Sequence, residues 1–129
     1  METLIKTKKY PLEDLTQKVI GCAFKIFNEI GYGYSEKVYQ QAMSIELEKS
    51  GVSFEREKYA KILYDGQVAG RFFLDFLIDN KLAVEIKVRR EIFPSDWTQL
   101  LNYLKAKDLK VGLLIVFSKH KVLIKRLVN

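Results

Sequence analysis

Apolar residues in the first part of the chain recur every three or four positions, which is the spacing of an amphipathic helix. The pattern predicts one helix over residues 12–30, with Pro11 in its first turn, and a second helix over residues 36–50. A glycine-rich segment over residues 31–34 separates them, and Ser35 can cap the second helix. The inward side of the first helix is expected to be Leu12, Leu15, Val19, Cys22, Ala23, Ile26 and Ile30, and that of the second Val38, Ala42 and Ile45.

From residue 52 onward, apolar or alternating runs separated by turn residues predict strands. The expected strands are residues 52–64, 71–78, 82–88, 111–117 and 121–128, with a helix over about 94–107 between the third and the fourth. This order, α-α-β-β-β-α-β-β, predicts an α/β protein in which helices flank a mixed β-sheet. We expect a basic lead-in over residues 1–10, followed by one domain over residues 11–129.

Composition and charge exclude several classes of protein. A single cysteine excludes an internal disulfide and a cysteine-cluster zinc site. The longest apolar run, residues 111–117, is far shorter than the roughly 20 residues that span a bilayer, and the first residues lack the apolar core of a secretory signal. We therefore expect a cytoplasmic protein with no membrane partner. Residues 65–129 hold 12 basic and 7 acidic residues, +5 of the net +6, which suits nucleic acid although a lysine-rich surface is the commoner cause.

Three charged residues lie inside otherwise apolar predicted strands. Asp75 interrupts residues 71–78, and Glu85 and Lys87 share one face of residues 82–88 because they are two positions apart. Burying such charges unpaired costs several kcal/mol. In an antiparallel pair of strands, the numbers of any two paired residues add to the same sum. Asp75 shares a face with Glu85 only if that sum is even, for example 160. We therefore predict an odd connection, such as the three residues 79–81, or a β-bulge.

Two carboxylates beside a lysine form the donor set of a divalent-metal site. Oxygen ligands favour Mg²⁺ or Mn²⁺, and the carbonyl of Ile86 lies between Glu85 and Lys87 in sequence and could be a further ligand. Lys87 could orient a water molecule or stabilise its hydroxide form. A half-buried network of ion pairs among Asp75, Glu85 and Lys87 explains the same residues equally well.

Asp75 followed by Glu85-Ile86-Lys87 resembles the bipartite motif of the PD-(D/E)xK nuclease superfamily, with Leu74 in place of the proline. The segment from Gly33 to Tyr39 resembles the signature of the GxxExxY protein family, and the whole resemblance runs over residues 12–128. It implies a restriction-endonuclease-like single domain that hydrolyses phosphodiester bonds of nucleic acid, with DNA favoured, using Mg²⁺ or Mn²⁺ held by Asp75 and Glu85.

The resemblance also implies roles for two helices. Glu36 is expected to approach the metal centre, and Tyr39, on the same side of its helix, is expected to contact nucleic acid. A first-turn acid and a core-edge aromatic explain these two residues as well. Gln99 and Tyr103 resemble the QxxxY element of RecB-like nucleases, whose helix contributes to the wall that faces DNA. This resemblance implies that Gln99 supports Lys87 or a backbone phosphate and that Tyr103 contacts nucleic acid. If Asp96 caps that helix, however, Gln99 could instead complete a capping box, and Tyr103 could be a half-buried aromatic.

Arg89 and Arg90 follow the Glu-x-Lys strand directly and are expected to contact phosphates, although they could be merely solubilising. Two other functions on the same fold stay open: a catalytically weak or inactive nucleic-acid-binding module, and a protein-interaction module. Because one small domain carries one cutting site, cleavage of both strands of a duplex would suggest a homodimer.

Overall fold

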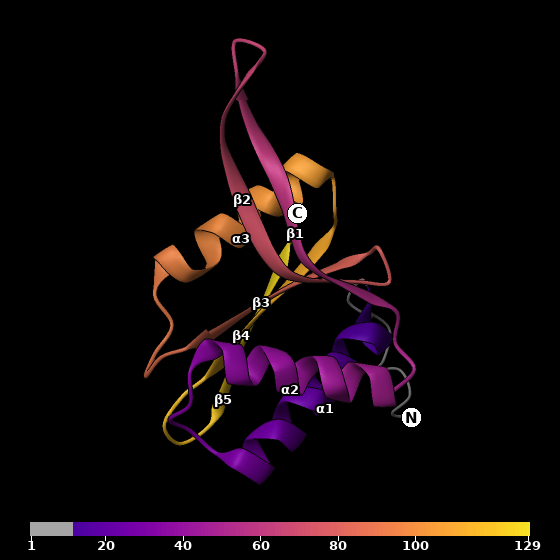
Figure 1. Cartoon of the computed structure of the whole chain (residues 1–129), viewed down its shortest axis with the longest axis vertical. Coiled ribbons are helices and arrows are strands. Elements are labelled where there is room, and N and C mark those ends of the chain that lie inside the picture. Colours follow the sequence, from indigo (N-terminus) through magenta and orange to yellow (C-terminus); the bar gives the residue numbers. More distant parts are fainter. Residues whose placement is uncertain (1–11) are drawn as a thin grey trace, which may run out of the picture.

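The computed structural model describes residues 12–129, which form three helices and five strands (Figure 1). The elements are α1 (Glu13–Ile30), α2 (Glu36–Lys49), β1 (Phe54–Tyr64), β2 (Gln67–Ile78), β3 (Leu82–Val88), α3 (Pro94–Lys107), β4 (Val111–Phe117) and β5 (Val122–Val128). This is the predicted order. The expected lead-in over residues 1–10 and the expected place of Pro11 lie outside the described residues. Within those residues, no helix has both the length and the apolar character that crossing a bilayer requires.

The five strands form one mixed sheet in the order β1-β2-β3-β4-β5. Neighbouring strands are antiparallel except for β3 and β4, which are parallel and are connected through α3. Helices α1 and α2 pack on one face of the sheet, and α3 packs on the other. The fold is therefore the predicted α/β arrangement, a mixed sheet between two helical layers.

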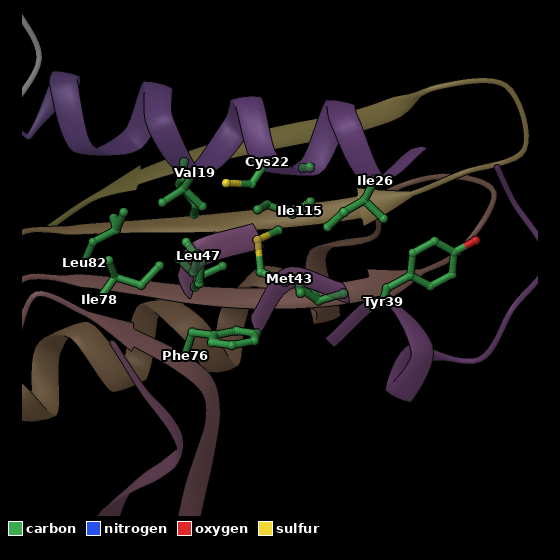
Figure 2. Packing of buried hydrophobic residues seen from close by; sticks show 14 of the residues in the cluster. Val19, Cys22, Ile26, Tyr39, Met43, Leu47, Phe76, Ile78, Leu82 and Ile115 are labelled. Atoms are coloured by element: carbon green, nitrogen blue, oxygen red, sulfur yellow. The ribbon is translucent and has the colours of Figure 1, made fainter. Parts of the chain in front are cut away.

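The larger buried cluster lies between the α1–α2 layer and the sheet (Figure 2). Helix α2 contributes Tyr39, Met43 and Leu47, all fully buried, whereas the expected Val38 and Ile45 are 40% and 48% exposed. The predicted inward face of α2 was therefore wrong for Val38 and Ile45, whereas Ala42 is half-buried and packs against the cluster. Positions 39, 43 and 47 also share a helical stripe, and their larger side chains bury more apolar surface. This rotation of the helix turns Glu36 and Gln40 toward the sheet.

The second buried cluster lies between α3 and the opposite face of the sheet. Helix α3 approaches β4 closely at Gly112, where an added Cβ would lie 3.2 Å from a side-chain carbon of Leu104 and 3.3 Å from two of Leu100. The absence of a side chain at Gly112 therefore allows α3 to pack directly on β4.

We expect Gly112→Val to lower the free energy of unfolding by about 1–3 kcal/mol, because the added methyl groups must displace α3. Gly21→Ala is the matched control: Gly21 is exposed in the middle of α1, and a Cβ there meets nothing within 4 Å. That change should raise stability by roughly 0.5–1 kcal/mol, since alanine is the better helix former. Urea unfolding measures both values, and unchanged stability of Gly112→Val would show that α3 is not closely packed here.

Strands β1 and β2 form an arm that extends beyond the helical layers (Figure 1). Their connection, Asp65 and Gly66, has positive φ at both residues, as expected of a tight hairpin turn. Strand β2 begins at Gln67, four residues before the predicted start at Arg71. The added residues are largely exposed and belong to the strand through pairing with β1 rather than through burial, which explains why the hydrophobic pattern did not reveal them.

Candidate metal and catalytic centre

Side chains along a strand normally alternate between the two faces of the sheet. In β1 and β2 this alternation is interrupted at positions that lie opposite each other. Leu74 belongs to the cluster beneath α3, yet Phe76, two residues later, belongs to the cluster beneath α1 and α2. A regular strand would place both side chains on one face. Asp75 lies at this interruption, and Glu57 of β1, which has a φ of 56°, lies opposite it outside the ladder of paired residues.

The pairing of β2 with β3 confirms the predicted register. Phe76 pairs with Val84 and Ile78 with Leu82, so paired residue numbers add to 160, and residues 79–81 form the odd connection. Asp79 and Asn80 have positive φ, and the Lys81 N–H donates to the carbonyl of Ile78 at 3.0 Å. These residue types tolerate that conformation better than most. The turn therefore sets a register that brings Asp75 opposite Glu85.

The ladder between β2 and β3 ends one pair before these residues, and the two carboxylates take over its hydrogen bonds. The Ile86 N–H donates to Oδ2 of Asp75 at 2.7 Å, and the Asp75 N–H donates to Oε1 of Glu85 at 2.9 Å. Gln40 of α2 donates from Nε2 to Oδ1 of Asp75 at 3.1 Å. Both carboxylates are thus fixed in the gap where the strands separate.

Both carboxyl groups are difficult to ionise in this gap. Burial raises the pKa of Glu85 to about 8, with the negative charge of Asp75 as the next cause. Burial also raises the pKa of Asp75, although hydrogen bonds from Ile86 and Gln40 oppose that shift. The charge of Lys87 lowers the pKa of both groups, and that of Glu36 raises both. Glu36 and Lys87 therefore lie within electrostatic reach of the carboxylate pair.

The donor atoms fit a hard divalent cation. In a strand, the N–H and C=O of one residue point to the same side, so the Ile86 carbonyl points into the gap that its N–H faces. Carboxylate and carbonyl oxygens are the ligands that Mg²⁺ and Mn²⁺ prefer. Within residues 12–129 there is no group of three or more acidic, histidine or cysteine side chains placed to hold a metal ion. Water would have to complete the coordination, as is usual for Mg²⁺.

Gln40 is a residue of the site that sequence analysis missed. It lies one helical turn after Glu36, and its half-buried amide holds Asp75. The available signal was its spacing, because residues four apart share one side of a helix. Glu36, in the first turn of α2, is half-buried, as is Lys87 near the end of β3.

The two tyrosines expected to contact nucleic acid are core residues. Tyr39 has no exposed surface, donates its hydroxyl to the carbonyl of Gly31 at 2.5 Å, and stacks on Phe117 with ring centroids 4.3 Å apart. Tyr103 is 1% exposed and lies within the cluster beneath α3. The expected contacts with nucleic acid were therefore wrong for both residues, and the alternative of structural aromatics holds.

Gln99 is exposed on α3 and lines a surface hollow with Arg71, Phe72 and three further residues of α3, but with neither Asp75 nor Glu85. The capping-box alternative for Gln99 was wrong. Helix α3 begins after Phe93, and the carboxylate of Asp96, in the first turn, accepts the Phe93 N–H at 2.9 Å. The structure therefore places Gln99 beside the arm, and its support of catalysis stays a prediction.

The two arginines after β3 have different surroundings. Nε of Arg89 lies 2.7 Å from the carboxylate of Asp96, whose side chain is fully buried, so Arg89 ties the end of β3 to the start of α3. Arg90 is exposed and lines a surface hollow with residues 118–121, which include two lysines. Contact with phosphate stays a prediction for both, and the exposed Arg90 is the freer to make it.

The arrangement of strands, helices and carboxylates is that of a restriction-endonuclease-like fold. A sequence model of the PD-(D/E)XK nuclease superfamily matches residues 13–127, and the chain belongs to this superfamily. Its members generally use divalent metals and act on nucleic acid. The narrower GxxExxY assignment stays a prediction.

A structural comparison agrees on the fold. The solved structure described as "Crystal structure of SSO0001" has a TM-score of 0.61 and 20% sequence identity, over 73% of this chain and 50% of that chain. The protein thus spans about half the length of that structure, and the likeness concerns the fold alone. No curated protein matches the sequence.

Proposed function

We propose that this protein is a metal-dependent phosphodiesterase that hydrolyses nucleic acid, with DNA as the favoured substrate. The observation that carries this proposal is the pair of carboxylates of Asp75 and Glu85, which backbone N–H groups hold in one gap of the sheet beside Lys87. An ion network that served stability alone would be a poor reason for this geometry, because burial raises the pKa of both acids and the charge of Asp75 raises that of Glu85 further.

Each residue of the site has a distinct task. Asp75, Glu85 and the carbonyl of Ile86 would hold Mg²⁺ or Mn²⁺. A bound ion of this kind lowers the pKa of water and stabilises the negative charge that develops on a phosphate. Lys87 would donate a hydrogen bond from its ammonium group to orient the attacking water. Gln40 keeps Asp75 in place, and Glu36 adds negative charge at the edge of the site.

The proposal is tested by calorimetric titration of Mg²⁺ and Mn²⁺ into the wild type, Asp75→Asn and Lys87→Ala. Asparagine keeps an oxygen to accept the Ile86 N–H but removes the charge, so Asp75→Asn should fold and lose metal binding. Lys87→Ala should still bind metal. Asp108→Asn changes an exposed carboxylate at the end of α3 and should bind like the wild type.

Labelled DNA and RNA oligonucleotides, offered as single strands, duplexes and junctions, then identify the substrate. Cleavage should require the metal and should be lost in Asp75→Asn. Absence of metal binding at millimolar concentration, together with absence of cleavage of every oligonucleotide, would refute the proposed function.

A further inference from the structure

One face of the β1–β2 arm carries an ordered pattern of aromatic and basic side chains. Tyr59 pairs directly with Phe73 across the two strands, and Lys61 pairs with Arg71 on the next row of the same face. The rings of Tyr59 and Phe73 have centroids 5.8 Å apart, and the guanidinium of Arg71 lies 5.6 Å from the centroid of Tyr59. We call these four residues the stacking face.

The stacking face is open, whereas the opposite side of the arm is covered at the level of Tyr59 and Phe73. Ala60 and Leu74, which alternate with the stacking face along their strands, are buried beneath α3. Tyr59 and Phe73, in contrast, are 42% and 60% exposed. Two aromatic rings left exposed side by side, and flanked by charge, are typical of a binding surface rather than of an ordinary protein exterior.

The charges of the stacking face indicate an anionic partner. Like charges directly opposite each other in an antiparallel pair are destabilising, and Lys61 faces Arg71 in this way. A surface hollow of about 420 Å³ at the edge of β1 is lined by Tyr59 and Lys61 of the stacking face and, beyond that face, by Glu57, Lys58 and Lys107, so the edge carries further positive charge. A phosphate beside these groups would relieve their mutual repulsion.

The stacking face also lies in line with the candidate catalytic centre. Phe73 precedes Asp75 by two residues in β2, and Tyr59 follows Glu57, which lies opposite Asp75, by two residues in β1. A chain laid along the stacking face would therefore reach Asp75, and the gap that Asp75 shares with Glu85, by following β2.

We propose that the stacking face binds single-stranded nucleic acid, with unpaired bases against Tyr59 and Phe73 and phosphates against Lys61 and Arg71. The inference rests on the proposed nuclease function and specifies its substrate as a single strand or an unpaired end. Aromatic rings can stack only on bases whose faces are free, and basic side chains between such rings follow the phosphate backbone. A duplex hides these base faces and offers the arm its phosphates alone.

Fluorescence anisotropy with a labelled single-stranded oligothymidylate tests the inference, in EDTA so that no metal-dependent cleavage intervenes. The double variant Tyr59→Ala/Phe73→Ala should bind the single strand about 10- to 100-fold more weakly, which is the usual effect of removing aromatic platforms. Its affinity for a duplex of equal length should change by less than about twofold. Both side chains are largely exposed, so the variant should melt like the wild type.

Matched controls lie outside the stacking face. Tyr64 is 78% exposed at the end of β1, beyond the register shift that follows Ile62 and next to the hairpin turn, so Tyr64→Ala should leave affinity unchanged. Lys61→Gln/Arg71→Gln should reduce the slope of log affinity against log salt by about 1.4, since each phosphate contact to a single strand contributes about 0.7. Lys18 is exposed on α1, outside the arm and outside the hollow beside Tyr59, so Lys18→Gln should change the slope less.

The outcomes separate this inference from the proposed function. If the wild type binds metal and cleaves nucleic acid while Tyr59→Ala/Phe73→Ala keeps its single-strand affinity, the stacking face is wrong and the nuclease stands. If light scattering shows instead that this variant dissociates a dimer without loss of affinity, the arm is an interface between two copies, and the inference is overturned. If the wild type binds neither metal nor oligonucleotide, both are refuted.

Discussion

Replacing Lys87 with alanine should reduce metal-dependent cleavage of nucleic acid by roughly 100- to 1,000-fold, the usual effect of losing one group that stabilises charge in the transition state. Lys87 lies two residues after Glu85 in β3, and its charge lowers the pKa of both carboxyl groups. Its ammonium group is therefore within electrostatic reach of the place where the attacking water and the phosphate would meet. The change leaves both carboxylates and their backbone hydrogen bonds in place, so metal binding should persist.

Single-turnover cleavage of a labelled oligonucleotide at saturating Mn²⁺ or Mg²⁺ measures this loss. Lys81→Ala is the matched control, because Lys81 lies at the other end of β3, is exposed, and is 4.0 Å from Asp79 in the turn. This variant should cleave like the wild type. A Lys87→Ala protein that cleaves within about threefold of the wild-type rate would show that Lys87 belongs to a structural ion network and not to the chemistry.

The order of elements and the pairing of Asp75 with Glu85 could be predicted from the sequence because both depend on short-range patterns. The side-chain period of a strand fixes which residues share a face, and the length of the connection between β2 and β3 fixes the register. The prediction that a shared face for Asp75 and Glu85 requires an odd connection or a β-bulge therefore needed no tertiary information.

The face of α2 could not be predicted in the same way. Val38, Ala42 and Ile45 satisfy helical spacing as well as Tyr39, Met43 and Leu47 do, and the choice depends on how much volume the space above β3 and β4 must hold. The rotation that buries the larger set also turns Gln40 toward Asp75. The rotation of α2 about its axis thus determined both the core position of Tyr39 and the contact of Gln40 with Asp75.

The interruption of β1 and β2 at Glu57 and Asp75 was equally invisible in the sequence. A glutamate with positive φ is uncommon, and nothing in its neighbours requires that conformation. The interruption exists because the arm packs on α3 between this level and the hairpin turn, whereas the opposite ends of β1 and β2 pack on α1 and α2. Asp75 lies where the two packing regions meet, which frees its carboxylate to enter the gap between β2 and β3.

Glu85 should make the metal-free protein less stable as the pH rises. Its pKa in the folded protein is about 8, above the ordinary value of 4.5 that applies in the unfolded chain. The folded state therefore holds the proton more tightly between these values, so the contribution of Glu85 to stability is complete below about pH 4.5 and is lost as the pH rises through 8. The pKa of Asp75 is raised as well, so the slope of the unfolding free energy against pH belongs to the pair of carboxyl groups.

Urea unfolding in EDTA between pH 5 and pH 9 measures this slope, and Glu85→Gln should flatten it. Glutamine keeps an oxygen for the Asp75 N–H and cannot ionise, so this variant should exceed the wild type at pH 9 by a few kcal/mol, since one pKa unit corresponds to about 1.4 kcal/mol. Glu48 is exposed in α2, so Glu48→Gln should keep the wild-type slope.

Millimolar Mg²⁺ should stabilise the wild type most at high pH, because a cation binds the ionised pair, and should leave Glu85→Gln nearly unchanged. A wild-type slope that neither Glu85→Gln nor Mg²⁺ alters would mean that these carboxylates are not the buried, repelling pair on which the metal site depends.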